Sequence, residues 1–313
     1  ANLRIRFRQT GTARQFRIDD VKLTGTADEV TAAAITPEGS TVICGGGSVV
    51  LTASAGGSFY DWTVPGGATD PGDSVNYTAS VAGTYTVTIT DANGCTSSDS
   101  ETVTTAIAPD ITLGANPTVC EGITSANLTY SGATGSPNQY SIDFNAAANT
   151  EGFADVGVTA LGASPIALVV PGGAAAGTYS GTLTVYNSVS GCSSAGDAFT
   201  VTVAAAPAQP GTITQANPSG SSVCATASGV TYTIGTVSTA TSYTWSVPAG
   251  AIITAGQGST TITVDWNGVS AGSQNVTVSA VNSCGTGTAK SQACTGISGA
   301  PTAATAGEGS NVS

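Results

Sequence analysis

Cysteine is the residue type in this sequence with the clearest capacity for chemistry. The chain has 313 residues, of which seven are cysteine and none is histidine. Zinc sites use closely spaced Cys and His ligands, and no two cysteines here stand in Cys-x-x-Cys spacing, so the pattern argues against a metal cluster. Disulfides in an oxidising, extracellular compartment are the better interpretation. The seven positions are Cys44, Cys95, Cys120, Cys192, Cys224, Cys284 and Cys294.

Neighbouring cysteines in chain order form three pairs, one in each of three successive stretches of the sequence. The predicted disulfides are Cys44–Cys95, Cys120–Cys192 and Cys224–Cys284. Closing loops of this size stabilises a module by about 4 kcal/mol on a loop-entropy argument. Cys294 is left over, either as a free thiol or as the partner of a residue beyond Ser313. We therefore expect every bridge to lie within a single module.

Enzymatic catalysis lacks its usual residues in this sequence. Serine and threonine are abundant, but there is no histidine to activate them, and Lys290 is the one lysine after position 22. The acidic residues are scattered singly, without the paired carboxylates of a hydrolytic cleft. The sequence therefore predicts a protein that is not an enzyme and that has no cofactor, with calcium as the one ion for which ligands are present.

Calcium would bind through hard oxygen ligands in glycine-rich turns. The candidate ligands are Asp70, Asp73, Asp91 and Asn93. None of them has the spacing of a complete site, and the same residue types also close turns by hydrogen bonds from side chain to backbone. The turn-closing role is the simpler interpretation of all four residues.

Charge is distributed very unevenly along the chain. Six of the seven basic residues lie between Arg4 and Lys22, and the rest of the chain has one lysine against 17 acidic residues, a net charge of about −16. A surface of this sign repels nucleic-acid phosphates and anionic lipid, so we expect no nucleic-acid partner. The longest apolar stretches, such as Pro165–Val170, are far too short to cross a bilayer. We therefore expect no membrane insertion.

A repeated β unit must position these residues. The stretch Tyr60-Asp61-Trp62-Thr63-Val64-Pro65 returns as Tyr243-Thr244-Trp245-Ser246-Val247-Pro248. Tyr85, Val87 and Ile89 alternate with threonines, which is the period of a half-buried strand. Strands are predicted over 59–64, 83–90 and 101–105, among others. No run has the apolar spacing of a long amphipathic helix, so the predicted fold class is all-β.

The tryptophans have two possible roles. Trp62, Trp245 and Trp266 could serve as platforms on which sugars stack. Each of them alternates with threonine or another polar residue along a predicted strand, which favours packing in a core. We therefore expect buried tryptophans.

Three modules account for most of the chain. Residues 1–27 read as the closing hairpin of a truncated upstream sandwich, with Leu3, Ile5 and Phe7 on one face. The same hairpin could instead be a strand donated to a neighbouring subunit. The predicted organisation is residues 1–27 as hairpin, 28–37 as linker, 38–108, 109–206 and 207–297 as modules one, two and three, and 298–313 as a linker to a further domain.

Modules one and three resemble the PKD-like and immunoglobulin-like β-sandwich repeats of large surface adhesins that gliding bacteria export by type IX secretion. Module two resembles a companion repeat of the same adhesins. The motifs that carry the resemblance are Val42-Ile43-Cys44, Tyr60-x-Trp62, Gly83-Thr84-Tyr85, Asn93-Gly94-Cys95, Asn116 to Cys120, Gln139 to Phe144, Ala176 to Tyr179, Val223-Cys224, Tyr243-x-Trp245 and Asn282-Ser283-Cys284-Gly285.

The resemblance implies tandem sandwich modules in a secreted, cell-surface protein that takes part in cell adhesion or forms a filament. Its expected role is that of disulfide-tied spacers, with neighbouring modules of the same longer chain as partners. Alternatives are a glycan-binding module that recognises surface glycans, and a fibre subunit that assembles with other adhesin subunits by strand donation from residues 3–23. Asp73-Ser74-Val75 also resembles the O-glycosylation motif of these bacteria, which makes Ser74 a candidate acceptor.

Overall fold

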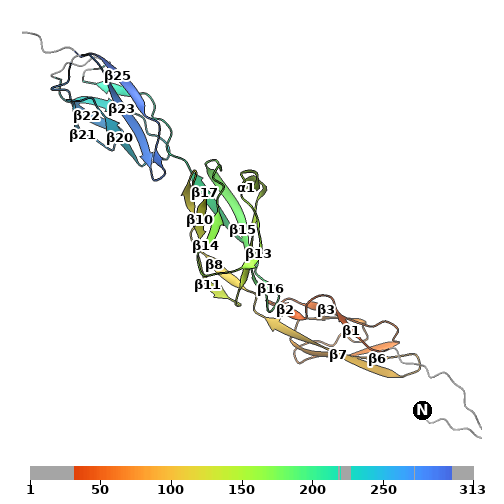
Figure 1. Cartoon of the computed structure of the whole chain (residues 1–313). Helices are drawn as coiled ribbons and strands as arrows, with labels where there is room; N and C mark the ends of the chain where they lie inside the picture. The colour runs from red at the N-terminus through yellow and green to blue at the C-terminus, as the bar shows by residue number, and fades with distance from the viewer. Residues whose placement is uncertain (1–31, 218, 220–226, 271, 298–313) are drawn as a thin grey trace, which may run out of the picture. The chain divides into compact units, whose positions relative to one another are not determined.

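The structure is a computed structural model that describes residues 32–217, 219, 227–270 and 272–297. Within the described residues every regular element is a β-strand, apart from the five-residue helix α1 (Ala146–Thr150) (Figure 1). The chain divides into two compact units, one with residues up to Thr41 and Gly47–Thr104, the other with Val42–Gly46 and Thr105 onward. The all-β fold class is confirmed, and the architecture is a tandem of immunoglobulin-like sandwiches. Modules one, two and three below are the sandwiches built from β1–β7, β8–β17 and β18–β25.

Module one is made of a three-stranded and a four-stranded sheet, in the orders β1-β3-β5 and β2-β7-β6-β4. Tyr85, Val87 and Ile89 of β6 are buried, and the threonines between them face outward, as their alternation predicts. The Tyr85 hydroxyl donates to the Val81 carbonyl over 2.7 Å, which anchors the start of β6. The strands are β1 (Ile35–Pro37), β2 (Val42–Cys44), β3 (Val49–Ala53), β4 (Phe59–Thr63), β5 (Asn76–Ala79), β6 (Gly83–Thr90) and β7 (Thr96–Ala106).

Module two packs two short sheets, β10-β14 and β11-β8, and a larger sheet in the order β13-β12-β15-β17-β9, with β16 paired to β15. Its core has no tryptophan and is filled by Phe144, Phe153, Phe199 and Tyr179. The strands are β8 (Asp110–Leu113), β9 (Thr118–Cys120), β10 (Ser125–Leu128), β11 (Tyr130–Thr134), β12 (Gln139–Phe144), β13 (Val156–Ala160), β14 (Ile166–Val169), β15 (Gly177–Asn187), β16 (Cys192–Ser193) and β17 (Asp197–Ala204).

Module three has one sheet in the order β18-β19-β22-β21 and a second in which β23 pairs with β20, β24 and β25. Tyr232, Val264 and Trp266 fill the space between the sheets together with Trp245. The strands are β18 (Thr214–Ala216), β19 (Val230–Thr233), β20 (Ser242–Ser246), β21 (Ile252–Ala255), β22 (Thr261–Asp265), β23 (Gly272–Asn282), β24 (Gly285–Thr286) and β25 (Lys290–Ile297).

Two of the predicted segment boundaries differ from those of the structure. The predicted linker 28–37 contains β1, because Ile35 is buried and pairs with Ala53 of β3. The end of β7 and the segment Val42–Gly46 belong to the second compact unit, so the units do not divide at the predicted boundary after Ala108. The hairpin at residues 1–27, Cys224 and the segment 298–313 lie outside the described residues.

Candidate functional site

Four of the cysteines form two disulfide bonds, and each bond joins two different modules. Cys44 of β2 is bonded to Cys192 of β16, with the Cα atoms 5.7 Å apart and 148 residues between them in sequence. Cys120 of β9 is bonded to Cys284, which lies between β23 and β24, with a Cα separation of 5.2 Å and a sequence separation of 164 residues. All four cysteines belong to the second compact unit. The two bonds interleave along the chain.

The predicted bridge within module two is wrong because its cysteines lie at opposite ends of one strand. Parallel pairing of β9 with β17 sets Cys120 beside Ala204, the last residue of β17. Cys192 instead pairs with Asn187, before β17 begins. The eight residues of β17 separate the two ends by about 26 Å, whereas a disulfide requires Cα atoms about 4.4–6.8 Å apart.

The same geometry makes the predicted Cys44–Cys95 bridge wrong. The amide of Gly45 donates to the carbonyl of Ala106, so Cys44 lies beside the last residue of β7. Cys95 precedes the first residue of β7, a strand of 11 residues and about 35 Å. The predicted Cys224–Cys284 bridge is also wrong, since Cys284 is bonded to Cys120.

Further contacts between modules two and three accompany the Cys120–Cys284 bond. The Asn282 side-chain amide donates to the Ala205 carbonyl over 2.9 Å, and the Gln209 side-chain amide donates to the Ala289 carbonyl over 2.8 Å. A Cβ on Gly287 would lie 2.1 Å from the carbonyl oxygen of Pro207, so glycine is required for this approach. The chain segment after β17 is thus held by two hydrogen bonds and a close backbone contact, beside the covalent bond that Cys120 makes at the end of β9.

The Cys44–Cys192 bond is surrounded by a second set of close contacts. A Cβ on Gly135 would lie 2.5 Å from the Ala108 carbonyl oxygen, and a Cβ on Gly45 would lie 3.3 Å from the Cβ of Ala108. The Asn187 side-chain amide donates to the Gly135 carbonyl over 2.9 Å. The sequence offered no signal for these glycines, because their role depends on a chain segment that is distant in sequence.

An acidic pair lies in module two near this bond. Asp197 begins β17, and Asp110 begins β8. Burial raises the pKa of the Asp197 carboxyl above its usual value, and the negative charge of Asp110 raises it further. One carboxylate oxygen of Asp197 is buried without a hydrogen-bond partner. This carboxylate therefore costs stability at neutral pH.

The two unbonded cysteines within the described residues have opposite environments. Cys95 is exposed in the turn between β6 and β7. Cys294 is fully buried in module three, with its sulfur 3.5 Å from the Tyr232 hydroxyl. Burial raises the pKa of the Cys294 thiol, which keeps it neutral and unreactive. Cys294 is thus a free thiol in this structure, and its bond to a residue beyond Ser313 stays a prediction.

Two of the calcium candidates, Asp70 and Asp91, act as turn residues, and Asp73 is hydrogen-bonded to strand β4. Asp70 accepts a hydrogen bond from the Gly72 amide, Asp73 accepts one from the Tyr60 amide, and Asp91 accepts two, from the amides of Asn93 and Cys95. Among the described residues no group of three or more His, Cys, Asp or Glu side chains could hold a metal ion.

The remaining candidates split between core and surface. Trp62 and Trp245 are 3% exposed and Trp266 is 0% exposed, so the prediction of core packing is confirmed and none of them offers a stacking face. The indole Nε1–H groups of Trp62 and Trp245 donate to the carbonyls of Ser74 and Ser259. The Ser74 hydroxyl donates to the Asn76 carbonyl over 2.8 Å, and its glycosylation remains a prediction.

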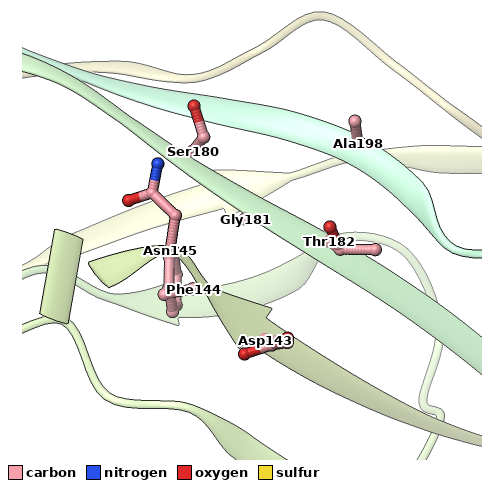
Figure 2. Close-up of a pocket in the computed structure, with 7 residues that line it drawn as sticks. All are labelled: Asp143, Phe144, Asn145, Ser180, Gly181, Thr182 and Ala198. Atoms are coloured by element: carbon pink, nitrogen blue, oxygen red, sulfur yellow. The ribbon is translucent and has the colours of Figure 1, made fainter. Parts of the chain in front are cut away.

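A shallow hollow of about 180 Å³ lies over strands β12, β15 and β17 of module two (Figure 2). Ser180 and Thr182 reach it from the outward face of β15, and Asp143 and Ala198 are the register neighbours of Thr182 on the two adjoining strands. Gly181 between them faces inward, where a Cβ would lie 2.8 Å from the ring of Phe199. The polar side chains of the lining include one carboxylate, from Asp143, and the hydroxyls of Ser180 and Thr182.

Comparison with known proteins finds one family model that matches the third module. Residues 206–294 match the family described as PKD-like domain. No curated protein matches the chain. No helix in the described part of the chain has the length and hydropathy to cross a membrane.

Solved structures of tandem sandwich domains align with the chain at low identity. The fibronectin(III)-like modules of Clostridium thermocellum CbhA are 12% identical, with a TM-score of 0.35 over 55% of this chain and 95% of that one. The FN1-FN3 domains of chicken CNTN1 are 13% identical, with a TM-score of 0.34 over 85% and 98%. Sidekick-1 immunoglobulin domains 1-5 are 14% identical, with a TM-score of 0.31 over 88% and 61%.

Proposed function

We propose that this chain is a non-enzymatic spacer segment of an extracellular surface adhesin or filament, in which disulfides stiffen the junctions between modules. The observation that carries the proposal is that both bonds join modules instead of closing loops within them. A bond within a sandwich stabilises that sandwich alone, whereas a bond between sandwiches limits their relative rotation. Linkers between domains otherwise permit such motion.

An oxidising compartment follows from the same bonds. Each bond closes a loop of about 150 residues or more, which is worth about 5 kcal/mol on a loop-entropy argument. In the reducing cytosol such bridges are rare, and this stabilisation would be lost. We therefore assign the protein to the cell exterior, as the family resemblance also implies, with type IX secretion as the proposed export route.

Stiffness of the junction between modules two and three tests the proposal directly. Spin labels attached without cysteine chemistry at Thr182 and Thr244, both exposed, report the distance between the two modules by pulsed electron resonance. We expect one narrow distance distribution for the oxidised chain and a broad one for the Cys120→Ser/Cys284→Ser variant. The control Cys95→Ser should retain the narrow distribution. An equally broad distribution for the oxidised parent chain would contradict the spacer function.

The alternative functions have less support from the described residues. Glycan binding by module three relied on Trp266, which is fully buried. A fibre that assembles by strand donation relies on residues 3–23, which lie outside the described residues. Partners among surface glycans or other adhesin subunits remain predictions.

A further inference from the structure

We infer that Cys95 forms a third bond of the same kind, with a strand-end cysteine of a module that precedes module one in the native polypeptide. The inference rests on the proposed spacer function and extends it to a further partner. Cys95 is one of three equivalent positions, and the other two, Cys192 and Cys284, are both bonded to a cysteine of the preceding module.

The three positions are equivalent in strand order and in turn chemistry. Each cysteine follows a strand that has a hydrogen-bonded neighbour on both sides, namely β6, β15 or β23, at the turn that leads to the next strand. In each turn an Asp or Asn side chain accepts backbone amide hydrogen bonds close to the cysteine. These residues are Asp91 before Cys95, Asn187 before Cys192 and Asn282 before Cys284.

The partner positions are also equivalent. Cys44 is the last residue of β2, and Cys120 is the last residue of β9. Each lies beside the end of the final strand of its module, β7 or β17, where the chain continues into the next module. The turn cysteine of that next module returns to this place, as the hydrogen bond from Asn282 to the Ala205 carbonyl shows. The pairing rule is therefore strand-end cysteine of one module with turn cysteine of the next.

Module one satisfies half of this rule. Its strand-end cysteine, Cys44, is bonded forward to module two, while its turn cysteine is free and exposed. Cys44 is the first cysteine of the sequence, so the partner of Cys95 is not among the preceding 43 residues. The partner chemistry is a thiol at the end of a short strand, next to the last strand of its own sandwich.

Bond formation requires an oxidant, and a disulfide carrier of the export compartment supplies it by exchange. The thiolate of Cys95 attacks one sulfur of the carrier disulfide, which forms a mixed disulfide and releases one carrier thiolate. The strand-end thiolate then attacks the Cys95 sulfur and expels the second carrier thiolate. Two protein thiols are oxidised to one disulfide, and one carrier disulfide is reduced to a dithiol.

Peptide mapping of the native protein tests the inference. The protein is collected from the surface of the cells that make it, alkylated without reduction and digested. We expect the peptide that contains Cys95 to be joined to a peptide from a preceding module whose cysteine ends a β-strand. An alkylated Cys95, or a bond from Cys95 to Cys224 or Cys95 of a second copy, would overturn the inference.

Internal controls separate this inference from the proposed function. The same digest should contain the Cys44–Cys192 and Cys120–Cys284 peptides, and their absence would refute the spacer proposal itself. Cys95→Ser should expose one new alkylatable thiol in a preceding module, just as Cys284→Ser should expose Cys120. Because Cys95 is exposed, its substitution leaves the core of module one intact. No newly alkylated cysteine in the Cys95→Ser protein would again overturn the inference.

Discussion

Replacement of Cys192 by serine should hardly change the fully stretched length of the chain, because the two interleaved bonds limit that length together. With both bonds formed, a chain pulled from its ends has three covalent routes between the joined pair Cys44–Cys192 and the joined pair Cys120–Cys284. The shortest of them is the segment from Cys120 to Cys192, and the segment from Cys44 to Cys120 is only slightly longer. Loss of the first bond therefore transfers the load to a route of nearly equal length.

The lengths follow from sequence positions and from an extended rise of about 3.5 Å per residue. The taut path has about 144 residues with both bonds, about 148 without Cys44–Cys192, about 164 without Cys120–Cys284 and about 312 without either. The single losses thus lengthen the chain by about 14 and 70 Å, and the double loss lengthens it by about 590 Å. The effects are strongly non-additive.

Single-molecule force spectroscopy on the full chain, with free thiols alkylated beforehand, measures these lengths after complete unfolding. Cys192→Ser, Cys284→Ser and the double variant form the series, and Cys95→Ser is the matched control without a length change. Bridges confined to single modules would give a different result. Loss of a Cys120–Cys192 bridge would add about 72 residues, or about 250 Å, to the stretched length of the chain. A gain of that size for Cys192→Ser would refute the interleaved arrangement.

Three further predictions concern stability. Gly287→Ala should destabilise module three by about 1–3 kcal/mol in urea unfolding, since its Cβ would meet the Pro207 carbonyl, whereas Gly235→Ala, with open space around it, should be close to neutral. Asp110→Asn should stabilise the chain by up to about 1 kcal/mol at pH 7 and less at pH 3. The pH dependence follows from the raised pKa of Asp197: protonation of this carboxyl stabilises the folded state at low pH, and that stability is lost as the pH rises and the carboxyl ionises. Calorimetry that gives an equal gain in stability for Asp110→Asn at both pH values would contradict this prediction. Tyr85→Phe should cost module one about 1 kcal/mol by removing the bond to the Val81 carbonyl, and an unchanged midpoint of unfolding would refute this role.

The alternation of residues was sufficient to predict the strands that have one buried face. β6 spans Gly83–Thr90, as predicted, because Tyr85, Val87 and Ile89 alternate with threonines. β7 begins five residues before the predicted Glu101, because residues 96–100 contain no apolar side chain and only their pairing with β6 makes them a strand. β1 was missed for a similar reason, since a strand of three residues is too short to show a period.

The all-β class, the buried tryptophans and the presence of disulfides could be predicted from the sequence, because apolar period and residue type are local properties of the chain. Which cysteines are bonded to each other could not be predicted in this way. Pairing depends on which ends of the strands lie together, and the parallel placement of β9 against β17 puts Cys120 at the far end from Cys192. A single strand thus holds the two cysteines of one module about 26 Å apart and leaves each of them beside another module.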